Sequence, residues 1–442
     1  MIELIHKYVA GGPAVKVAGG IEALLRSGRI PAEAVLPPVR RVADALGVSP
    51  GTAASAYRLL QQRGLVRADG RRGTQVLPLP AQREYADAAV PEGALDLRAA
   101  SPDPALLPDL ARLLSAVSPR PGGYDQQHLD AALARPMRER FEADGVPGGD
   151  LIATSGAIGA IHRALRANLA PGDRVAVEDP GFNEHHACVT SLALVPVPVA
   201  MDDEGMRPES LGAALREGAR AVILTARCQS PTGAAMSVPR AAALREVLAA
   251  RPEVAVLIDD YASLVADVPY RDCAGPGRPR WLVVRSFNKP VAPDLRVAVA
   301  AGDAGTLERM RREQWLSDGW VSGYLQQMAA AAMSDARARA AIARAARAYA
   351  ERRRALIAAL RTRGVAAHGA SGLVAWVPVH DEAEVVSGLA SRGVYARAGA
   401  RYRLRSGPAV RIATCTLPLD RVQGLADHLA AVLRPSSRTR AP

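Results

Sequence analysis

One lysine stands apart from the other cations of the chain. Of 56 Lys and Arg residues only Lys7, Lys16 and Lys289 are lysines, so Lys289 is the only one beyond the first 80 residues. Arginine supplies the positive charge in the rest of the chain. A lone lysine in such a sequence favours chemistry that a guanidinium cannot perform. Forming an imine with an aldehyde is such chemistry, because it needs an amine that can lose its proton.

Polar residues that could hold a flat, phosphorylated ligand follow two predicted strands. Ser286 precedes Lys289 at the end of an apolar run, and Arg296 follows the lysine by seven positions, so a phosphate could be held on both sides. Asp259 and Tyr261 end another apolar run, at the sheet edge where α/β folds usually bind ligands. The carboxylate could pair with a protonated ring nitrogen, and the phenol could hold a ring hydroxyl group.

Two more segments could complete such a site. Residues Thr154–Ala157 run from a predicted strand into a predicted helix, whose free backbone amides suit a phosphate. Phe182 follows another strand and could stack on a planar ring. Singly, an aspartate or a phenylalanine after a strand is more often a turn or core residue. The set gains weight because its segments stand in order around the only available lysine.

The elements that would position these residues alternate between strands and helices. Four apolar runs read as strands and are separated by helical stretches rich in Ala, Leu and Arg: residues 174–177, 221–224, 254–258 and 281–284. Alternation of this kind predicts an α/β body with a mainly parallel sheet covered by helices.

The N-terminal part of the chain has a different pattern. Residues 1–80 hold 11 Lys and Arg against 5 Asp and Glu, a net +6 out of +12 for the whole chain. Helical spacing over 13–25, 36–48 and 49–64 precedes two short strands, 65–67 and 74–76, joined by a turn with adjacent arginines. This order predicts a winged helix-turn-helix, and its basic charge suits DNA.

The segment LPPVRRVADALGVSPGTAASAYRLLQQRGLVRADGRRGTQV resembles the winged-helix domain of GntR-type regulators over its whole length. The resemblance places five residues at or near the duplex: Arg40, Ser49, Thr52, Tyr57 and Arg72. For Arg40 we expect a phosphate contact. For Tyr57 the alternative is a place in the small core of the head, which we also expect for Leu59 and Leu60.

The body resembles fold-type I pyridoxal-phosphate (PLP) enzymes of aminotransferase type over about residues 95–435. Joined to this head, it resembles the MocR subfamily of GntR regulators. The resemblance implies that Lys289 forms the internal aldimine, Asp259 pairs with the pyridine nitrogen, Tyr261 binds the cofactor hydroxyl and Phe182 stacks on the ring. It also implies a set of residues that hold the phosphate: Ser155, Gly156, Ala157, Ser286 and Arg296.

Arg411 matches the position where these proteins carry an arginine for a ligand's α-carboxylate, which a fork-shaped guanidinium can bind through two parallel hydrogen bonds. Other positions depart from the family pattern. Ser230 stands where aminotransferases have an asparagine that touches the cofactor hydroxyl, and Asn288 and Pro290 flank the lysine where smaller or hydroxylated residues are usual. The geometry of the pocket is therefore expected to differ there.

Length and composition agree with this organisation. The chain has 442 residues, of which 49% are hydrophobic and 23% charged, as in globular proteins with more than one folding unit. The expected domains are a winged helix-turn-helix over 1–77, a linker over 78–94, and an aminotransferase-like domain over 95–435 with a small subdomain at about 95–120 and 305–435. Its longest apolar runs are too short to span a membrane, and we expect a cytoplasmic protein. The four cysteines show no metal-ligand spacing, so free buried thiols are expected and a metal site is not.

Three functions remain open from the sequence. The first is a transcription regulator that senses PLP or an amino-acid-like effector through the aldimine at Lys289. The second is an active PLP-dependent aminotransferase with an accessory DNA-binding head, and the third is a DNA-binding dimer whose body is an empty scaffold. The resemblance further implies a homodimer, whose paired heads favour a repeated or palindromic operator. We assign no role to His162, His185 or His186.

Overall fold

The structure is a computed structural model, and it describes residues 1–26, 29–31, 33–62, 65–68, 73–76, 89–118, 124, 129–146 and 149–433. The N-terminal head and the body are described separately below. No helix in these ranges is both long enough and apolar enough to cross a membrane.

The head is a winged helix-turn-helix, as predicted. Its described elements are α1 (Ile2–Tyr8), α2 (Ala14–Arg26), α3 (Val39–Leu46), α4 (Pro50–Gln62), β1 (Val35–Leu36), β2 (Val66–Ala68) and β3 (Thr74–Val76). Gly47, with a φ of 62°, ends α3, and the Ser49 hydroxyl accepts a hydrogen bond from the Thr52 amide at the start of α4, at 3.0 Å. The strands pair antiparallel in the order β1-β3-β2. Sequence patterns missed α1 and β1, which are seven and two residues long.

The body is built on a mainly parallel sheet, as predicted. Within the described residues its strand order is β5-β12-β11-β10-β9-β6-β7-β8. The bounds are β5 (Asp150–Thr154), β6 (Arg174–Asp179), β7 (Val195–Asp202), β8 (Gly205–Met206), β9 (Ala219–Leu224), β10 (Ala255–Asp259), β11 (Trp281–Ser286) and β12 (Ala298–Gly302). Strands β9, β10 and β11 run parallel, whereas β12 is antiparallel to β11 and β5. All four runs expected as strands lie in or overlap β6, β9, β10 and β11.

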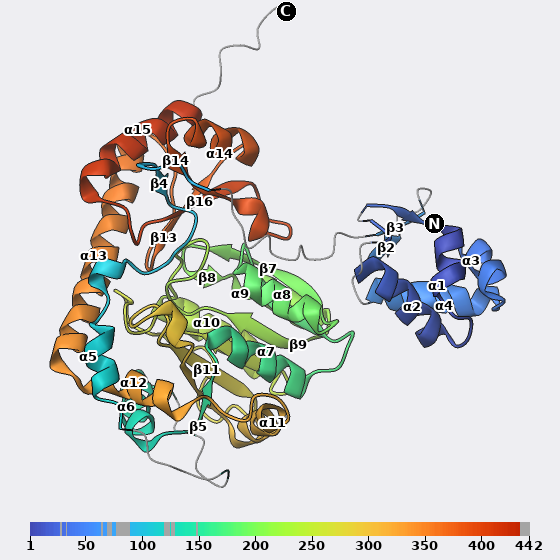
Figure 1. The fold of residues 1–442 in the computed structure, drawn as a ribbon, viewed down its shortest axis with the longest axis horizontal. Helices are drawn as coiled ribbons and strands as arrows, with labels where there is room; N and C mark the ends of the chain where they lie inside the picture. The colour runs from blue at the N-terminus through green and yellow to red at the C-terminus, as the bar shows by residue number, and fades with distance from the viewer. Residues whose placement is uncertain are drawn as a thin grey trace, which may run out of the picture. The chain divides into compact units, whose positions relative to one another are not determined.

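Helices cover this sheet, whose central strands are buried on both faces (Figure 1). They are α5 (Leu110–Ser115), α6 (Ala131–Ala143), α7 (Ala157–Asn168), α8 (Asn183–Ser191), α9 (Pro208–Arg216), α10 (Val238–Ala249), α11 (Ala304–Trp315) and α12 (Gly323–Ser334). Short 3-10 turns occur at Pro104–Leu106, Pro293–Leu295, Gly399–Arg401 and Leu419–Arg421. Because polar residues follow β6, β10 and β11, they gather at one edge of the sheet.

A second, smaller core completes the body. It contains β4 (Leu95–Asp96) paired with β14 (Val394–Tyr395), the antiparallel strands β13 (Val374–Pro378), β16 (Ala409–Ala413) and β15 (Arg397–Ala398), and the helices α14 (Glu382–Ala390) and α15 (Val422–Leu433). Helix α13 (Ala336–Arg361) runs along one side of the body toward this sheet (Figure 1). Tyr349 packs in the larger core and Leu356 in the smaller one. The two cores thus meet within α13. The subdomain boundary near residue 305 stays a prediction.

Candidate functional site

Lys289 lies in the turn that follows β11, where it is half-buried. Its Nζ donates a hydrogen bond to the carbonyl oxygen of Ala100. Burial lowers the pKa of the amine below its usual range, and the positive charge of Arg411 acts in the same direction. A lysine with a lowered pKa has a larger fraction of the neutral amine, which is the form that attacks an aldehyde.

Asp259 is the last residue of β10 and is only 2% exposed. One carboxylate oxygen, Oδ2, lies 2.9 Å from Nε2 of His185, and the other, Oδ1, has no hydrogen-bond partner among the described residues. A buried carboxylate oxygen without a donor is costly, so it favours a ligand that brings a donor to this position. A protonated pyridine nitrogen is such a donor, and on this observation the residues fit PLP.

The predicted phosphate-holding residues lie around the start of α7. Gly156 has a φ of +84°, and a Cβ there would stand 2.6 Å from Nη2 of Arg296, so a side chain would close the space between them. The same Nη2 donates to the carbonyl oxygen of Ser155 at 3.3 Å. Ala157 begins the helix, and Ser286 is buried at the end of β11. The structure therefore brings Ser155, Gly156, Ala157 and Arg296 together at one helix N-terminus, which suits an anion.

Tyr261 and Phe182 lie near the same strand ends. The Tyr261 hydroxyl donates to the carbonyl oxygen of Cys228 at 2.8 Å, and burial raises its pKa well above the usual value. The phenol oxygen therefore stays protonated and can still accept a hydrogen bond from a ligand. The ring of Phe182 meets the ring of His185 edge to face, with centroids 5.4 Å apart.

Two buried carboxylates fix the segment that presents Phe182. Glu178 accepts hydrogen bonds from Nε2 of Gln229 and from the backbone amide of Thr225, and burial raises its pKa to about 7. The neighbouring Asp179 accepts the backbone amides of residues 404–406. The end of β6 is thus held from the large sheet and from the smaller core at once.

Arg411 lies on β16 and is 5% exposed. Its Nη2 donates to the carbonyl oxygen of Arg98, and its guanidinium stands 4.8 Å from the ring centroid of Tyr402. Its Nε is buried and has no hydrogen-bond partner among the described residues. An N–H group left in this state is available to a carboxylate.

Sequence reasoning missed His185, to which it gave no role. The imidazole of His185 contacts Asp259, whereas His186 next to it is turned to the carbonyl oxygen of Glu178 at 3.0 Å. The two rings do point apart, but this did not exclude a place in the site. A usable signal was present, because residues three apart share a helix face and His185 stands three positions after Phe182.

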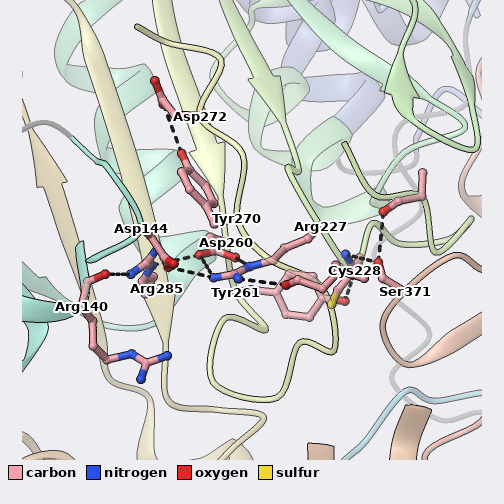
Figure 2. Close-up of polar contacts among 12 residues, drawn as sticks. Arg140, Asp144, Arg227, Cys228, Asp260, Tyr261, Tyr270, Asp272, Arg285 and Ser371 are labelled. Carbon is pink, nitrogen blue, oxygen red and sulfur yellow. Dashed lines mark hydrogen bonds and ion pairs between the residues drawn. The ribbon is translucent and has the colours of Figure 1, made fainter. Parts of the chain in front are cut away.

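A buried charge network behind the site was also missed (Figure 2). Asp260 is fully buried and accepts hydrogen bonds from Arg227 at 2.8 Å and from Arg285 at 2.9 Å. Both arginines also reach Asp144. Figure 2 further shows Cys228 between Tyr261 and Ser371. Its carbonyl oxygen accepts the hydrogen bond from the Tyr261 hydroxyl, and its backbone amide donates to the Ser371 hydroxyl oxygen at 2.7 Å.

Two of the positions that depart from the family pattern, Ser230 and Asn288, carry buried polar atoms. Among the described residues, neither the Ser230 hydroxyl nor Oδ1 of Asn288 has a hydrogen-bond partner, although both atoms are buried. The backbone amide of Asn288 donates to the Ser286 hydroxyl at 3.2 Å. All four cysteines are free and buried, as predicted, and the described residues hold no cluster that could bind a metal ion.

In the head, the predicted DNA-contacting residues divide into two groups. Arg40 and Ser49 are exposed at the starts of α3 and α4, and the Ser49 and Thr52 hydroxyls lie 2.8 Å apart. Tyr57 is buried, and its hydroxyl donates to the carbonyl oxygen of Pro37 at 2.6 Å. This geometry favours the alternative in which Tyr57 belongs to the core of the head. Arg72 lies outside the described residues.

Comparison with known proteins agrees with both parts of the chain. The family described as "Aminotransferase class I and II" matches residues 120–429, and "Bacterial regulatory proteins, gntR family" matches 13–76. The chain is 37% identical over 432 residues to the "Vitamin B6 salvage pathway transcriptional repressor PtsJ" of Salmonella typhimurium, covering 96% of this chain and 99% of the relative. It is 25% identical to the "Probable rhizopine catabolism regulatory protein MocR" of Rhizobium meliloti, covering 77% and 76%.

Solved structures show the same fold for the body. A kynurenine aminotransferase from Pyrococcus horikoshii superimposes with a TM-score of 0.70 at 21% identity, covering 79% of this chain and 92% of the other. An archaeal alanine:glyoxylate aminotransferase also gives 0.70, at 18% identity, covering 78% and 91%.

Fold and site together define a DNA-binding regulator whose second domain has the fold of PLP-dependent aminotransferases. The chain belongs to the MocR subfamily of GntR-type transcription regulators.

Proposed function

We propose that the body binds PLP covalently through Lys289, and that occupancy of this site by PLP or by an amino compound controls DNA binding by the head. The observation that carries the proposal is the buried Asp259 Oδ1, which has no partner among the described residues at the sheet edge shared with Lys289. The relative PtsJ is named as a transcriptional repressor of the vitamin B6 salvage pathway, which supports a vitamin B6 compound as the signal and repression as the outcome.

Each predicted residue has a role in this proposal. Lys289 would supply the amine that holds the cofactor through its aldehyde carbon. Asp259, held by His185, pairs with the ring nitrogen, Tyr261 holds the ring hydroxyl and Phe182 covers the ring. The phosphate lies on Ser155, Gly156, Ala157, Ser286 and Arg296. When bound, the cofactor supplies an electrophilic carbon that can exchange its lysine for another amine.

Arg411 extends the site to a ligand with a carboxylate. Within the described part of the chain the Nε–H of its buried guanidinium has no partner, so a carboxylate can replace the carbonyl oxygen of Arg98 and gain a second hydrogen bond. The effector class is therefore an α-amino acid or a similar amino carboxylate, whose amine can react with the cofactor.

The head supplies the contact with double-stranded DNA. Arg40 is exposed at the start of α3, where it can neutralise a phosphate, and Ser49 and Thr52 stand at the N-terminus of α4, which can enter the major groove. We assign Arg72 to the same surface on the resemblance alone. Tyr57 contributes indirectly, because its hydrogen bond to the carbonyl oxygen of Pro37 links α4 to the residues just before α3.

The expected test is a comparison of wild type with Lys289→Ala. Wild type mixed with PLP should gain a visible absorbance band that borohydride removes, leaving a stable pyridoxyl mass on the peptide that contains Lys289. The variant should show neither, and PLP should change the affinity of wild type alone for a DNA duplex selected from a random-sequence library. Absence of the band in wild type would refute the proposal and leave a DNA-binding protein with a scaffold body.

A homodimer is supported by a group of exposed apolar side chains, several of them aromatic, in the part of the chain around Asp318. Tyr124, Trp315, Leu316 and Tyr324 are between 56% and 82% exposed, and Trp320 contacts two of them, with ring centroids 6.0 Å from Tyr124 and 6.4 Å from Trp315. Large exposed apolar patches mark interaction surfaces. Asp318 lies within this stretch of chain and accepts a hydrogen bond from the Ser155 hydroxyl at 3.2 Å. A second copy seated here would therefore adjoin the phosphate.

We expect Leu316→Asp to shift the protein from dimer to monomer in sedimentation equilibrium, because the charge would be buried in the interface. Leu419→Asp is a matched control, because it makes the same change at another exposed leucine of the body, which is 46% exposed. A dimer of equal affinity in wild type and both variants would place the interface elsewhere.

An aminotransferase half-reaction is the second candidate, because the structure retains both an amine of lowered pKa and a buried arginine for the carboxylate. It predicts that L-amino acids bleach the visible band of the PLP-loaded protein and release the matching 2-oxo acid. A sensor that does no chemistry would change its spectrum without releasing an oxo acid.

A further inference from the structure

One short segment of the body accepts hydrogen bonds from both basic side chains of the site, Lys289 and Arg411. Residues 97–101 follow β4, and the carbonyl oxygen of Ala100 accepts the hydrogen bond from Lys289, while that of Arg98 accepts the one from Arg411. The proposed function gives these two cations to the cofactor aldehyde and to the ligand carboxylate. The segment and the ligands therefore compete for the same atoms.

The segment is fixed at both ends. At its start, Leu97 is buried in the smaller core and its carbonyl oxygen accepts the amide of Ala413 at 2.9 Å. At its end, the backbone amide of Asp103 donates to the Tyr349 hydroxyl at 3.0 Å, and Arg352 pairs with the Asp103 carboxylate at 2.8 Å. Residues 98–101 span the distance between these two attachments.

The side chain of Arg98 anchors the segment near its start. Its Nε and Nη2 donate to the two carboxylate oxygens of Asp96 at 2.9 and 2.8 Å, and its guanidinium lies 5.6 Å from the ring centroid of Tyr395. By contrast, Ala99 and Ser101 are exposed. The carbonyls of Arg98 and Ala100 are thus directed into the site mainly by the Arg98 anchor and by the two cations themselves.

Ligand binding competes with these contacts. A lysine nitrogen that has entered a C=N bond retains at most one N–H, and a carboxylate bound in parallel to Nε and Nη2 of Arg411 would share Nη2 with the carbonyl oxygen of Arg98. Carbonyl groups that lose their donors in a half-buried place favour a different position, where water can reach them.

We propose that residues 98–101 form a latch that is closed on Lys289 and Arg411 in the ligand-free body and opens when PLP and an amino carboxylate take these two groups. The inference rests on the proposed function and adds its regulation. The latch follows β4, and the chain before β4 leads to the head.

The test uses full-length protein with a fluorophore on the latch. In Ala99→Cys the new thiol is exposed while the four native cysteines are buried, so labelling is selective. The probes are PLP and the reduced phosphopyridoxyl adduct of L-alanine, which carries a ring and a carboxylate but cannot bond covalently to Lys289. Both should change the emission of the label, and the adduct should do so in Lys289→Ala as well.

Loosening the latch should strengthen ligand binding. Arg98→Ala removes the anchor, so the apparent affinity for PLP should rise about five-fold, because less of the protein is held in the closed state. The PLP concentration that half-maximally changes binding of the selected DNA duplex should fall by a similar factor. Arg112→Ala is the matched control, since Arg112 also makes two hydrogen bonds to one aspartate, Asp335, outside the site.

The outcomes separate the two proposals. If wild type binds PLP, but the label does not respond and Arg98→Ala binds PLP like wild type, the latch is refuted and the proposed function stands. If wild type does not bind PLP at all, both are refuted, because the latch then has no ligand to open it.

Discussion

Replacing Asp260 with alanine should lower the free energy of unfolding of the body by about 3–5 kcal/mol, which is the cost of leaving buried charges without their partner. Arg227 and Arg285 both form ion pairs with this carboxylate. Without it, Asp144 would be the one carboxylate among the described residues still paired with these two positive charges. Neither arginine can lose its charge in compensation, because guanidinium groups stay protonated. Denaturation by urea, followed by tryptophan fluorescence, measures the change.

Asp427→Ala provides a matched control, because Asp427 pairs with a single arginine, Arg363, and most of its side chain is exposed. Surface pairs contribute little, so this variant should unfold like wild type. Equal stability of both variants would show that the network around Asp260 does not hold the body together.

Asp259→Asn should weaken PLP binding about 10- to 100-fold, the range expected for losing a hydrogen bond between charged groups in a buried place. The amide keeps the size of the carboxylate but cannot balance a protonated ring nitrogen. Its contact with His185 can persist, so the fold should be preserved. Titration with PLP, followed by quenching of tryptophan fluorescence, gives the affinity of each protein.

Asp427→Asn is again the control, and it should bind PLP like wild type. Unchanged affinity in Asp259→Asn would mean that the buried oxygen of Asp259 does not face the cofactor, and would remove the observation on which the proposed function rests.

The strands and their polar ends could be predicted because apolar runs and the residues after them are local features. Lys289 and Asp259 each follow such a run, and parallel strands bring their carboxyl ends together whatever lies between them. The winged helix could be predicted from local features as well, because Gly47 marks the end of one helix and Ser49 the start of the next.

What could not be predicted depends on contacts between distant residues or on backbone atoms. The latch meets Lys289 and Arg411 through carbonyl groups, which every residue has, so no side chain of residues 98–101 marks the contact. The two-residue strand β4 has no periodicity to detect. The network of Asp260 joins four separate parts of the chain, and a sequence shows only that an aspartate follows a strand.

The long helix shared by both cores makes the body one cooperative unit. α13 has 26 residues and is about 39 Å long, with one end in each core. Between these ends Arg353 is buried, bonded to Asp267 at 2.7 Å and to the carbonyl oxygen of Gly369 at 2.9 Å. Neither core can melt without exposing part of a helix that the other needs. Damage to either core should therefore lower the stability of the whole body, including the segments that carry Lys289 and Arg411.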